Sequence, residues 1–278
     1  MIRFIKIAIR SFILTLTGID VVKLRQLPNL EYRTSEIERR TSEIEHHVSR
    51  FRTRVYMSRN DFLPNIAAGK FSYGYEEQDV VSSYRDFEDI FRGSEIFIKD
   101  RFCSYDNFFN IDDYVLEIGC GRGEFLELLA EKGVRYVGVD LDESMVLRCQ
   151  EKGLAPIIHK DFEDFLDESD SSIFDGIFSA QFIEHIPSDK VLDFFKKTHI
   201  ALKSGGVLIA ETVNPYSIEA FRTFHVDLTH QKILYPEVLL YLSKVAGFRK
   251  ASIYYPNNNG FDETQYDIAN EYAIIAYK

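Results

Sequence analysis

At 278 residues, the chain is long enough for one large α/β domain and a smaller appendage, because single domains typically have about 100–200 residues. Its composition, 45% hydrophobic and 28% charged residues, is that of an ordinary globular protein, and its net charge of −11 argues against a general nucleic-acid binder. The three cysteines are odd in number and widely spaced, so we expect no disulfide framework and a reducing, cytoplasmic compartment.

Charge is unevenly distributed along the chain. Residues 1–60 hold 12 of the 33 Lys and Arg but only 6 of the 44 Asp and Glu. The contrast between a basic N-terminal segment and an acidic remainder predicts that the two parts of the chain bind different partners. We therefore divide the chain into a basic part at 1–60, a linker containing Pro and Gly at 61–80, and a main domain at 81–278.

Residues 2–19 are rich in apolar side chains but are interrupted by Arg3, Lys6 and Arg10. The longest uncharged stretch is shorter than the roughly 20 residues that a membrane-spanning helix needs. The basic residues share one stripe of a helix, which is typical of a helix lying on an anionic bilayer. We expect a cytoplasmic protein that is peripheral on the inner membrane; the alternative is a helix docked on the protein's own domain or on a sister subunit.

A heptad is repeated almost unchanged, as Arg33–Arg39 and again as Arg40–His46. Two heptad positions four residues apart carry mostly apolar side chains, namely Leu30, Ile37, Ile44 and Phe51 at one and Thr34, Thr41, Val48 and Val55 at the other. This alternating spacing predicts a short coiled coil over residues 30–55, and hence a homo-oligomer. The alternative is a solvated helix that leans on the main domain.

The main domain begins with a strand, a tight turn and a helix. The strand is predicted at Tyr114–Gly119 and the helix at Glu124–Lys132. The turn between them contains Gly119, Cys120, Gly121, Arg122 and Gly123. Glycines let a backbone approach a ligand closely, and a helix N-terminus presents free N–H groups, so this turn predicts a cofactor site.

The spacing of the glycines distinguishes two kinds of cofactor. The Gly-x-Gly-x-x-Gly pattern of dinucleotide sites would need glycine where Glu124 stands. Glu117, two residues before the first glycine, suits a ligand ammonium group and would repel a pyrophosphate. The run from Glu117 to Gly123 resembles motif I of class I S-adenosylmethionine (SAM) methyltransferases, which implies SAM as the cofactor.

The resemblance extends to residues that follow the next predicted strands. Asp140 ends the second strand, where a carboxylate accepts the ribose hydroxyls, and Leu141 beside it would cover the adenine. By resemblance, Asp161 holds the adenine amino group and Phe162 lies near the ring. Gln181, at the carboxyl end of the fourth strand, joins the predicted cofactor site.

The remaining elements complete an α/β fold. Strands are predicted at Ala155–His159, Phe174–Ala180, Val207–Thr212 and Glu271–Tyr277, with a turn at Lys203–Gly206. The resemblance implies a Rossmann-like, seven-stranded and mostly parallel sheet with helices on both faces. An N-terminal helical or coiled-coil extension precedes it.

Flanking segments point to the methyl acceptor. They are Tyr84–Ser94, Phe182–Pro187, Glu211–Pro215, Phe224–His230 and Leu234–Glu237. They resemble the methyltransferase part of bacterial O-antigen chain-terminating enzymes. The resemblance implies methylation of a terminal sugar hydroxyl on a lipid-linked polysaccharide. Alternatives are a terminal phosphate, a small metabolite or quinone-like lipid, and a SAM-binding scaffold in a glycan assembly complex.

A sugar hydroxyl is a poor nucleophile at neutral pH, so a general base is expected nearby. His185 is the best placed, and His230 with Asp227 as its orienting partner comes next. Each histidine could instead order a loop. Arg92 binds the SAM carboxylate or forms a surface ion pair, and Tyr84 could reach the same region. No cluster with metal-ligand spacing is evident, so no metal is predicted.

Overall fold

The structure, a computed structural model, describes residues 92–256, 260–261 and 269–278. The predicted surface helix at 2–19, the coiled coil at 30–55, the linker at 61–80 and Tyr84 lie outside the described residues. Within the described ranges, no helix has both the length and the apolar composition needed to cross a bilayer.

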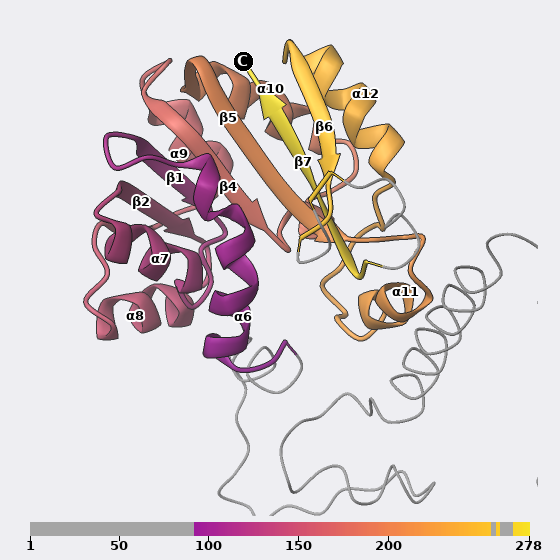
Figure 1. Cartoon of the computed structure of the whole chain (residues 1–278), viewed down its shortest axis with the longest axis horizontal. Helices are drawn as coiled ribbons and strands as arrows, with labels where there is room; N and C mark the ends of the chain where they lie inside the picture. The colour runs from indigo at the N-terminus through magenta and orange to yellow at the C-terminus, as the bar shows by residue number, and fades with distance from the viewer. Residues whose placement is uncertain (1–91, 257–259, 262–268) are drawn as a thin grey trace, which may run out of the picture. The chain divides into compact units, whose positions relative to one another are not determined.

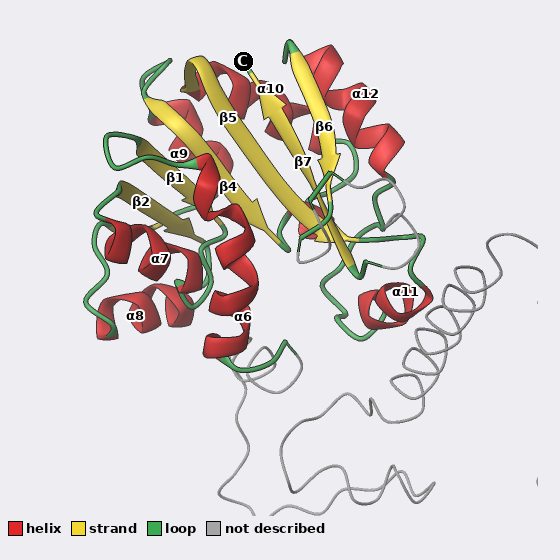
Figure 2. Cartoon of the chain, in the orientation of Figure 1, coloured by secondary structure: helices red, strands yellow, loops and turns green. Residues whose placement is uncertain are grey.

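One seven-stranded sheet forms the centre of the described domain, with the order β3-β2-β1-β4-β5-β7-β6. The strands are β1 (Tyr114–Ile118), β2 (Arg135–Asp140), β3 (Ile157–His159), β4 (Phe174–Ala180), β5 (Leu202–Val213), β6 (Lys250–Tyr254) and β7 (Glu271–Tyr277). Figure 2 shows them as arrows, with β7 running against both of its neighbours while the other pairings are parallel. The Rossmann-like, mostly parallel sheet predicted from the sequence is confirmed.

Helices cover both faces of this sheet, as predicted. They are α6 (Glu95–Phe102), α7 (Glu124–Lys132), α8 (Glu143–Glu151), α9 (Phe162–Glu168), α10 (Val191–Ala201), α11 (Ile218–Phe224) and α12 (Pro236–Ala246), with short 3-10 helices η1 (Cys103–Phe108) and η2 (Ile183–His185). In Figure 1, α7 lies in front of the sheet and α10 lies behind it. Parallel strands require such two-sided cover because both of their faces are apolar.

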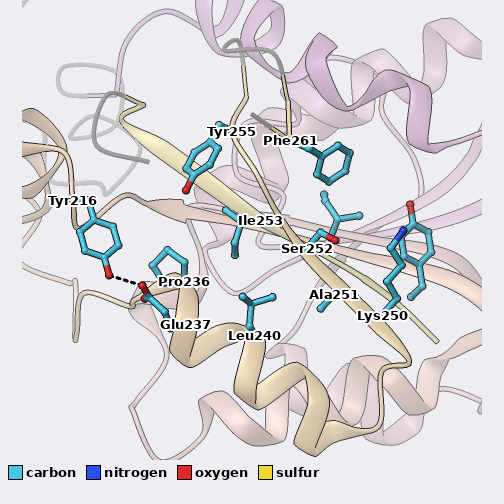
Figure 3. Close-up of a pocket in the computed structure, with 12 residues that line it drawn as sticks. Tyr216, Pro236, Glu237, Leu240, Lys250, Ala251, Ser252, Ile253, Tyr255 and Phe261 are labelled. Carbon is cyan, nitrogen blue, oxygen red and sulfur yellow. Dashed lines mark hydrogen bonds between the residues drawn. The ribbon is translucent and has the colours of Figure 1, made fainter. Parts of the chain in front are cut away.

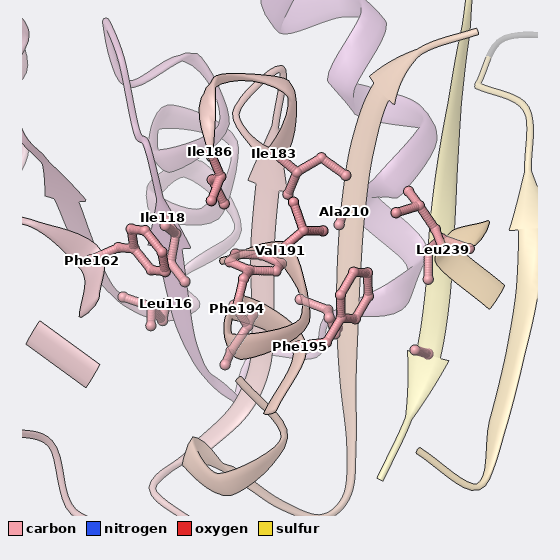
Figure 4. Close-up of a cluster of buried hydrophobic side chains, with 14 of the residues drawn as sticks. Leu116, Ile118, Phe162, Ile183, Ile186, Val191, Phe194, Phe195, Ala210 and Leu239 are labelled. Atoms are coloured by element: carbon pink, nitrogen blue, oxygen red, sulfur yellow. The ribbon is translucent and has the colours of Figure 1, made fainter. Parts of the chain in front are cut away.

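Two apolar cores, one on each face, hold the layers together. On one face Phe125 of α7 stacks on Phe178 of β4 with ring centroids 3.7 Å apart, and Phe102 of α6 meets the same ring edge-on. On the other face Phe194 of α10 and Phe162 of α9 pack over the sheet (Figure 4). Burying each such ring stabilises the fold by about 1.5–3 kcal/mol.

The structure corrects the predicted starts of two strands. β3 begins at Ile157, two residues later than predicted, because Pro156 precedes it and cannot donate to a ladder. β5 begins at Leu202 rather than Val207, so the predicted turn at Lys203–Gly206 lies inside the strand. The pairing with β4 shifts register there, because the extra residues form a bulge in which Gly205 has φ +82°.

Helix α6 is fastened to α8 by charge. The Ser94 side chain accepts a hydrogen bond from the Phe97 N–H and caps the start of α6. Glu95, in the first turn, lies 2.9 Å from Arg148 Nε and 2.8 Å from Lys152 Nζ. Burial alone would raise the pKa of Glu95, but these two cations outweigh it and lower the pKa to about 2.

Glu95→Gln therefore tests a pH-dependent contribution to stability. Because the folded-state pKa lies below the ordinary value of 4.5, the carboxylate stabilises the fold above that pH, and this stabilisation is lost as pH falls towards 2. We expect urea unfolding to show the largest difference between wild type and variant near pH 7, with the gap closing below pH 4.5. Glu151→Gln, which removes a more exposed partner of Arg148, should cost less at pH 7. A constant gap across the pH range would contradict the assignment.

Candidate active site

The turn after β1, residues 119–123, lies at the carboxyl end of the sheet and has glycine at three of its five positions. Gly119 has φ +68° and Gly123 has φ +80°, a region that side-chain-bearing residues rarely adopt. A Cβ atom on Gly119 would lie 2.4 Å from the Phe182 ring, and one on Gly123 would lie 2.6 Å from Leu154. Both positions therefore require glycine, and the turn can approach a ligand closely.

Asp140 lies beside this turn because β1 and β2 are parallel neighbours that end at the same edge. One of its carboxylate oxygens accepts the Gly121 N–H at 2.8 Å, and the other accepts the Asp142 N–H at 2.9 Å. Two backbone donors fix the plane of the carboxylate before any ligand binds. The contact of this carboxylate with the ribose hydroxyls stays a prediction.

Glu117 is buried within β1, with only 3% of its surface exposed. Its Oε2 atom is buried without a hydrogen-bond partner. Burial, followed by the nearby Cys149 and Glu124, raises the pKa of Glu117 well above its ordinary value. An unsatisfied buried carboxyl oxygen fits a cationic ligand group, so the residues present fit the ammonium end of SAM.

A cavity of about 330 Å³ opens at this edge. Its walls include Arg92, Gly119, Gly121, Asp140, Leu141, Asp142, Met145, Gln181, Phe182, His185 and Thr229. The structure thus brings half of the predicted cofactor residues, namely Arg92, Gly119, Gly121, Asp140, Leu141 and Gln181, together with the predicted base His185. Asp142 and Met145 were not predicted, and Phe182 and Thr229 were predicted only as members of the segments that point to the acceptor.

Other predicted residues lie near the cavity without being among its walls. Cys120 is buried, with its sulfur beneath Gly138, and Phe162 packs edge-on against Phe182. Asp161 caps α9 by accepting the Glu163 N–H at 2.7 Å. Their contacts with the cofactor stay predictions.

Gln181 lines the cavity in a strained conformation, with φ +53°. Its backbone N–H donates to the Glu211 carbonyl at 2.9 Å, and its side-chain Nε2 donates to the Glu211 carboxylate at 3.2 Å. That carboxylate is also bound by Arg101 at 2.9 Å and by the Tyr105 hydroxyl at 2.6 Å. A buried network therefore holds Gln181 in place.

On the other side of the cavity, His185 belongs to a short hydrogen-bonded chain. Its Nδ1 lies 2.9 Å from Thr229 Oγ1, and that hydroxyl donates to Asp227 Oδ1 at 2.6 Å. The Thr229 oxygen therefore accepts from His185 Nδ1, and Nε2 carries the lone pair. Burial, aided by the neighbouring His230, lowers the pKa of His185 to about 4.

His230 lies next to this chain, with its ring centroid 4.6 Å from that of His185. Its Nδ1 is 2.6 Å from the Phe224 carbonyl, so Nδ1 is the protonated nitrogen. The distance from Nε2 to Asp227 is 3.9 Å, longer than a hydrogen bond. Asp227 therefore positions Thr229 directly, while its predicted pairing with His230 is an electrostatic contact only.

Beside Thr229 and Asp227 lies a group of side chains of the types that can ligate a metal, which the sequence did not indicate. One ligand atom from each of Glu184, His185 and His230 lies within 4.8 Å of the other two. Glu184 is 1% exposed, and burial raises its pKa to about 7 although Thr212 donates to one of its oxygens. Residue spacing could not predict this cluster, because His230 is 45 residues after His185 along the chain.

A larger hollow of about 900 Å³ lies along the edge strand β6 and helix α12 (Figure 3). Its lining includes the aromatic residues Tyr216, Tyr255, Phe261 and Tyr277 together with Glu237 and Lys250. The Tyr216 hydroxyl donates to Glu237 at 2.6 Å. The hollow contains none of the predicted cofactor residues, so the smaller cavity is the better cofactor site.

Comparison with known proteins agrees with this geometry. Residues 85–252 match a family model described as a methyltransferase domain. The ubiquinone biosynthesis O-methyltransferase of Idiomarina loihiensis is 27% identical over 182 residues, covering 59% of this chain and 74% of that protein. Its counterpart in Xylella fastidiosa (strain 9a5c) is 33% identical over 105 residues, covering 36% of this chain and 42% of that protein.

A solved structure is similar over most of the chain. The SAM dependent methyltransferase from Archaeoglobus fulgidus has 29% sequence identity and a TM-score of 0.64, covering 71% of this chain and 100% of that one. The chain spans less than half the length of several curated relatives that it matches.

The Asp140 carboxylate gives a direct test of the cofactor site. In Asp140→Asn an amide N–H₂ would face a backbone N–H or a ribose hydroxyl, so we expect SAM affinity to fall at least tenfold in isothermal titration calorimetry. Asp175→Asn is the matched control, because Asp175 also accepts a backbone N–H, from Tyr114, but at the opposite edge of the sheet. Equal losses of affinity in the two variants would show that the effect is one of folding.

Proposed function

Because this chain belongs to the methyltransferase domain family, as a class I SAM-dependent methyltransferase, we propose that it methylates a hydroxyl oxygen of a bacterial cell-surface glycan. The proposed acceptor is a terminal sugar residue of a lipid-linked polysaccharide. The observation that carries the hydroxyl acceptor is the polar corner of His185, Thr229 and Asp227, which meets the wall of the cofactor cavity.

Bound SAM supplies a methyl group already activated by its sulfonium. The chain's task is then to align the acceptor oxygen with the methyl carbon and to remove the hydroxyl proton. As the new O–C bond forms and the S–C bond breaks, that proton moves to the polar corner. His185 lines the cavity and its Nε2 carries a lone pair, so it is the proposed proton acceptor.

Two further observations support a glycan acceptor. The segments around Arg92 and Asp227–His230 resemble those of glycan chain-terminating enzymes. The hollow along β6 begins, at Tyr216 and Tyr255, near the same carboxyl edge as the cofactor cavity, because β6 runs parallel to β5. Its aromatic and charged lining gives room for additional sugar units beyond the methylated one.

A second candidate follows from the relatives, which are named as ubiquinone biosynthesis O-methyltransferases. Methyl transfer to the hydroxyl of a quinone-like lipid would use the same cofactor cavity and the same base. The remaining candidates are a small metabolite, a terminal phosphate and a scaffold role without turnover.

We also propose how the chain reaches its acceptor. The basic, apolar segment at 2–19 would lie on the anionic inner membrane surface, and residues 30–55 would join copies of the chain. Both would bring the domain close to a lipid-linked substrate.

The experiment that tests the acceptor uses the full chain, tritiated SAM and isolated lipid fractions. We expect label in the lipid-linked glycan fraction of the source bacterium, retained when that fraction is treated beforehand with phosphatase. His185→Ala should lower turnover at least a hundredfold while His199→Ala, on the remote helix α10, leaves it unchanged.

Each other outcome selects another function. Label lost after phosphatase treatment indicates a terminal phosphate, and label only in the quinone fraction indicates the second candidate. A chain that binds SAM but labels no fraction supports the scaffold role and overturns methyl transfer to glycan.

A further inference from the structure

We propose that Glu184, His185 and His230 bind one divalent transition-metal ion, for which zinc is the natural probe. Glu184 and His185 come from η2, and His230 comes from the loop before α12. One ligand atom from each residue lies within 4.8 Å of the other two. Two imidazoles and one carboxylate form a ligand set used by catalytic zinc sites, which keep a further position open for water or substrate.

The buried carboxylate of Glu184 is the strongest argument for a bound cation. It is 1% exposed, and its Oε1 atom is buried without a hydrogen-bond partner, whereas the other oxygen accepts the Thr212 hydroxyl at 2.9 Å. A buried carboxylate oxygen that lacks a partner costs several kcal/mol unless a proton or a cation satisfies it. A metal ion at this corner would satisfy it together with the two imidazoles.

The two histidines are already oriented as metal ligands usually are. Each has its Nδ1 committed, in His230 to the Phe224 carbonyl at 2.6 Å and in His185 to Thr229 Oγ1 at 2.9 Å. In both rings the lone pair therefore resides on Nε2. Metal-ligating histidines typically donate their second nitrogen to a carbonyl or a carboxylate-linked group in this way, which fixes the tautomer and the ring plane.

The position of the site suggests its use, and this step rests on the proposed function. His185 lines the cofactor cavity, so an ion bound to it would lie at the acceptor side. An acceptor hydroxyl in the open coordination position would lose its proton more readily, since a bound cation stabilises the alkoxide. Asp227, whose Oδ2 is 3.9 Å from His230 Nε2, is placed to take that proton in place of the coordinated imidazole.

Zinc binding to the full, chelator-treated chain tests the site without any assay of turnover. We expect equilibrium dialysis to show one zinc ion per chain at this site, and cobalt in its place to give the visible absorption of a low-coordinate nitrogen and oxygen site. Glu184→Gln, His185→Asn and His230→Asn should each weaken zinc binding at least tenfold. His225→Asn is the matched control, because its ring meets Phe224 edge-on in the same segment but lies outside the cluster.

Folding and function are separated by two further measurements. Glu184→Gln keeps the shape of the side chain, and we expect it to bind SAM normally while zinc no longer raises its melting temperature. Zinc bound equally well by the three variants and by His225→Asn, or not bound by the wild type, overturns the site. Intact zinc binding without label in the glycan fraction would instead overturn the acceptor and leave the metal site standing.

Discussion

The carboxylate of Glu211 lies fully buried at the carboxyl end of β5 and joins three parts of the domain. Arg101 reaches it from α6, Tyr105 from η1, and Gln181 from the loop after β4. Breaking one partner of such a buried pair typically costs about 3–5 kcal/mol, because the remaining charge stays desolvated. Burial and the adjacent Glu211 raise the pKa of Tyr105 well above its ordinary value, so its hydroxyl stays a donor. The Glu211 carboxylate therefore holds both helix α6 and Gln181 in position.

The other buried carboxylates at this edge differ from Glu211 in how far the protein satisfies them. Asp140 accepts two backbone N–H groups, one on each carboxylate oxygen. Glu117 and Glu184 each retain a buried oxygen with no hydrogen-bond partner. An unsatisfied buried oxygen is costly, so each of these two positions favours binding of a cationic group. Glu117 lies before the glycine turn and Glu184 lies beside the two histidines, which are the places of the proposed SAM ammonium group and the proposed metal ion.

The sequence was sufficient for features whose cause is local. The bounds of α7, β4 and β7 agree with the structure, because alternation, helical periodicity and glycine spacing act over a few neighbouring residues. Strand β1 ends one residue earlier than predicted. It failed where segments far apart meet. The contact of Gln181 with Glu211 spans 30 residues, and that of Thr229 with His185 spans 44. Spacing suggested Asp227 as the partner of His230, but the loop turns the carboxylate towards the Thr229 hydroxyl instead. Such contacts depend on the path of a loop, which no local pattern encodes.

The Thr229 hydroxyl explains how the His185 imidazole can be both oriented and uncharged. A carboxylate bonded directly to an imidazole favours the protonated ring, which has no lone pair to offer. Here Thr229 stands between Asp227 and His185, so the ring is aligned through a neutral hydroxyl. Burial then dominates and lowers the pKa of His185 to about 4, which leaves the ring neutral near pH 7. A neutral imidazole carries a lone pair, which both the proposed proton transfer and the proposed metal site require.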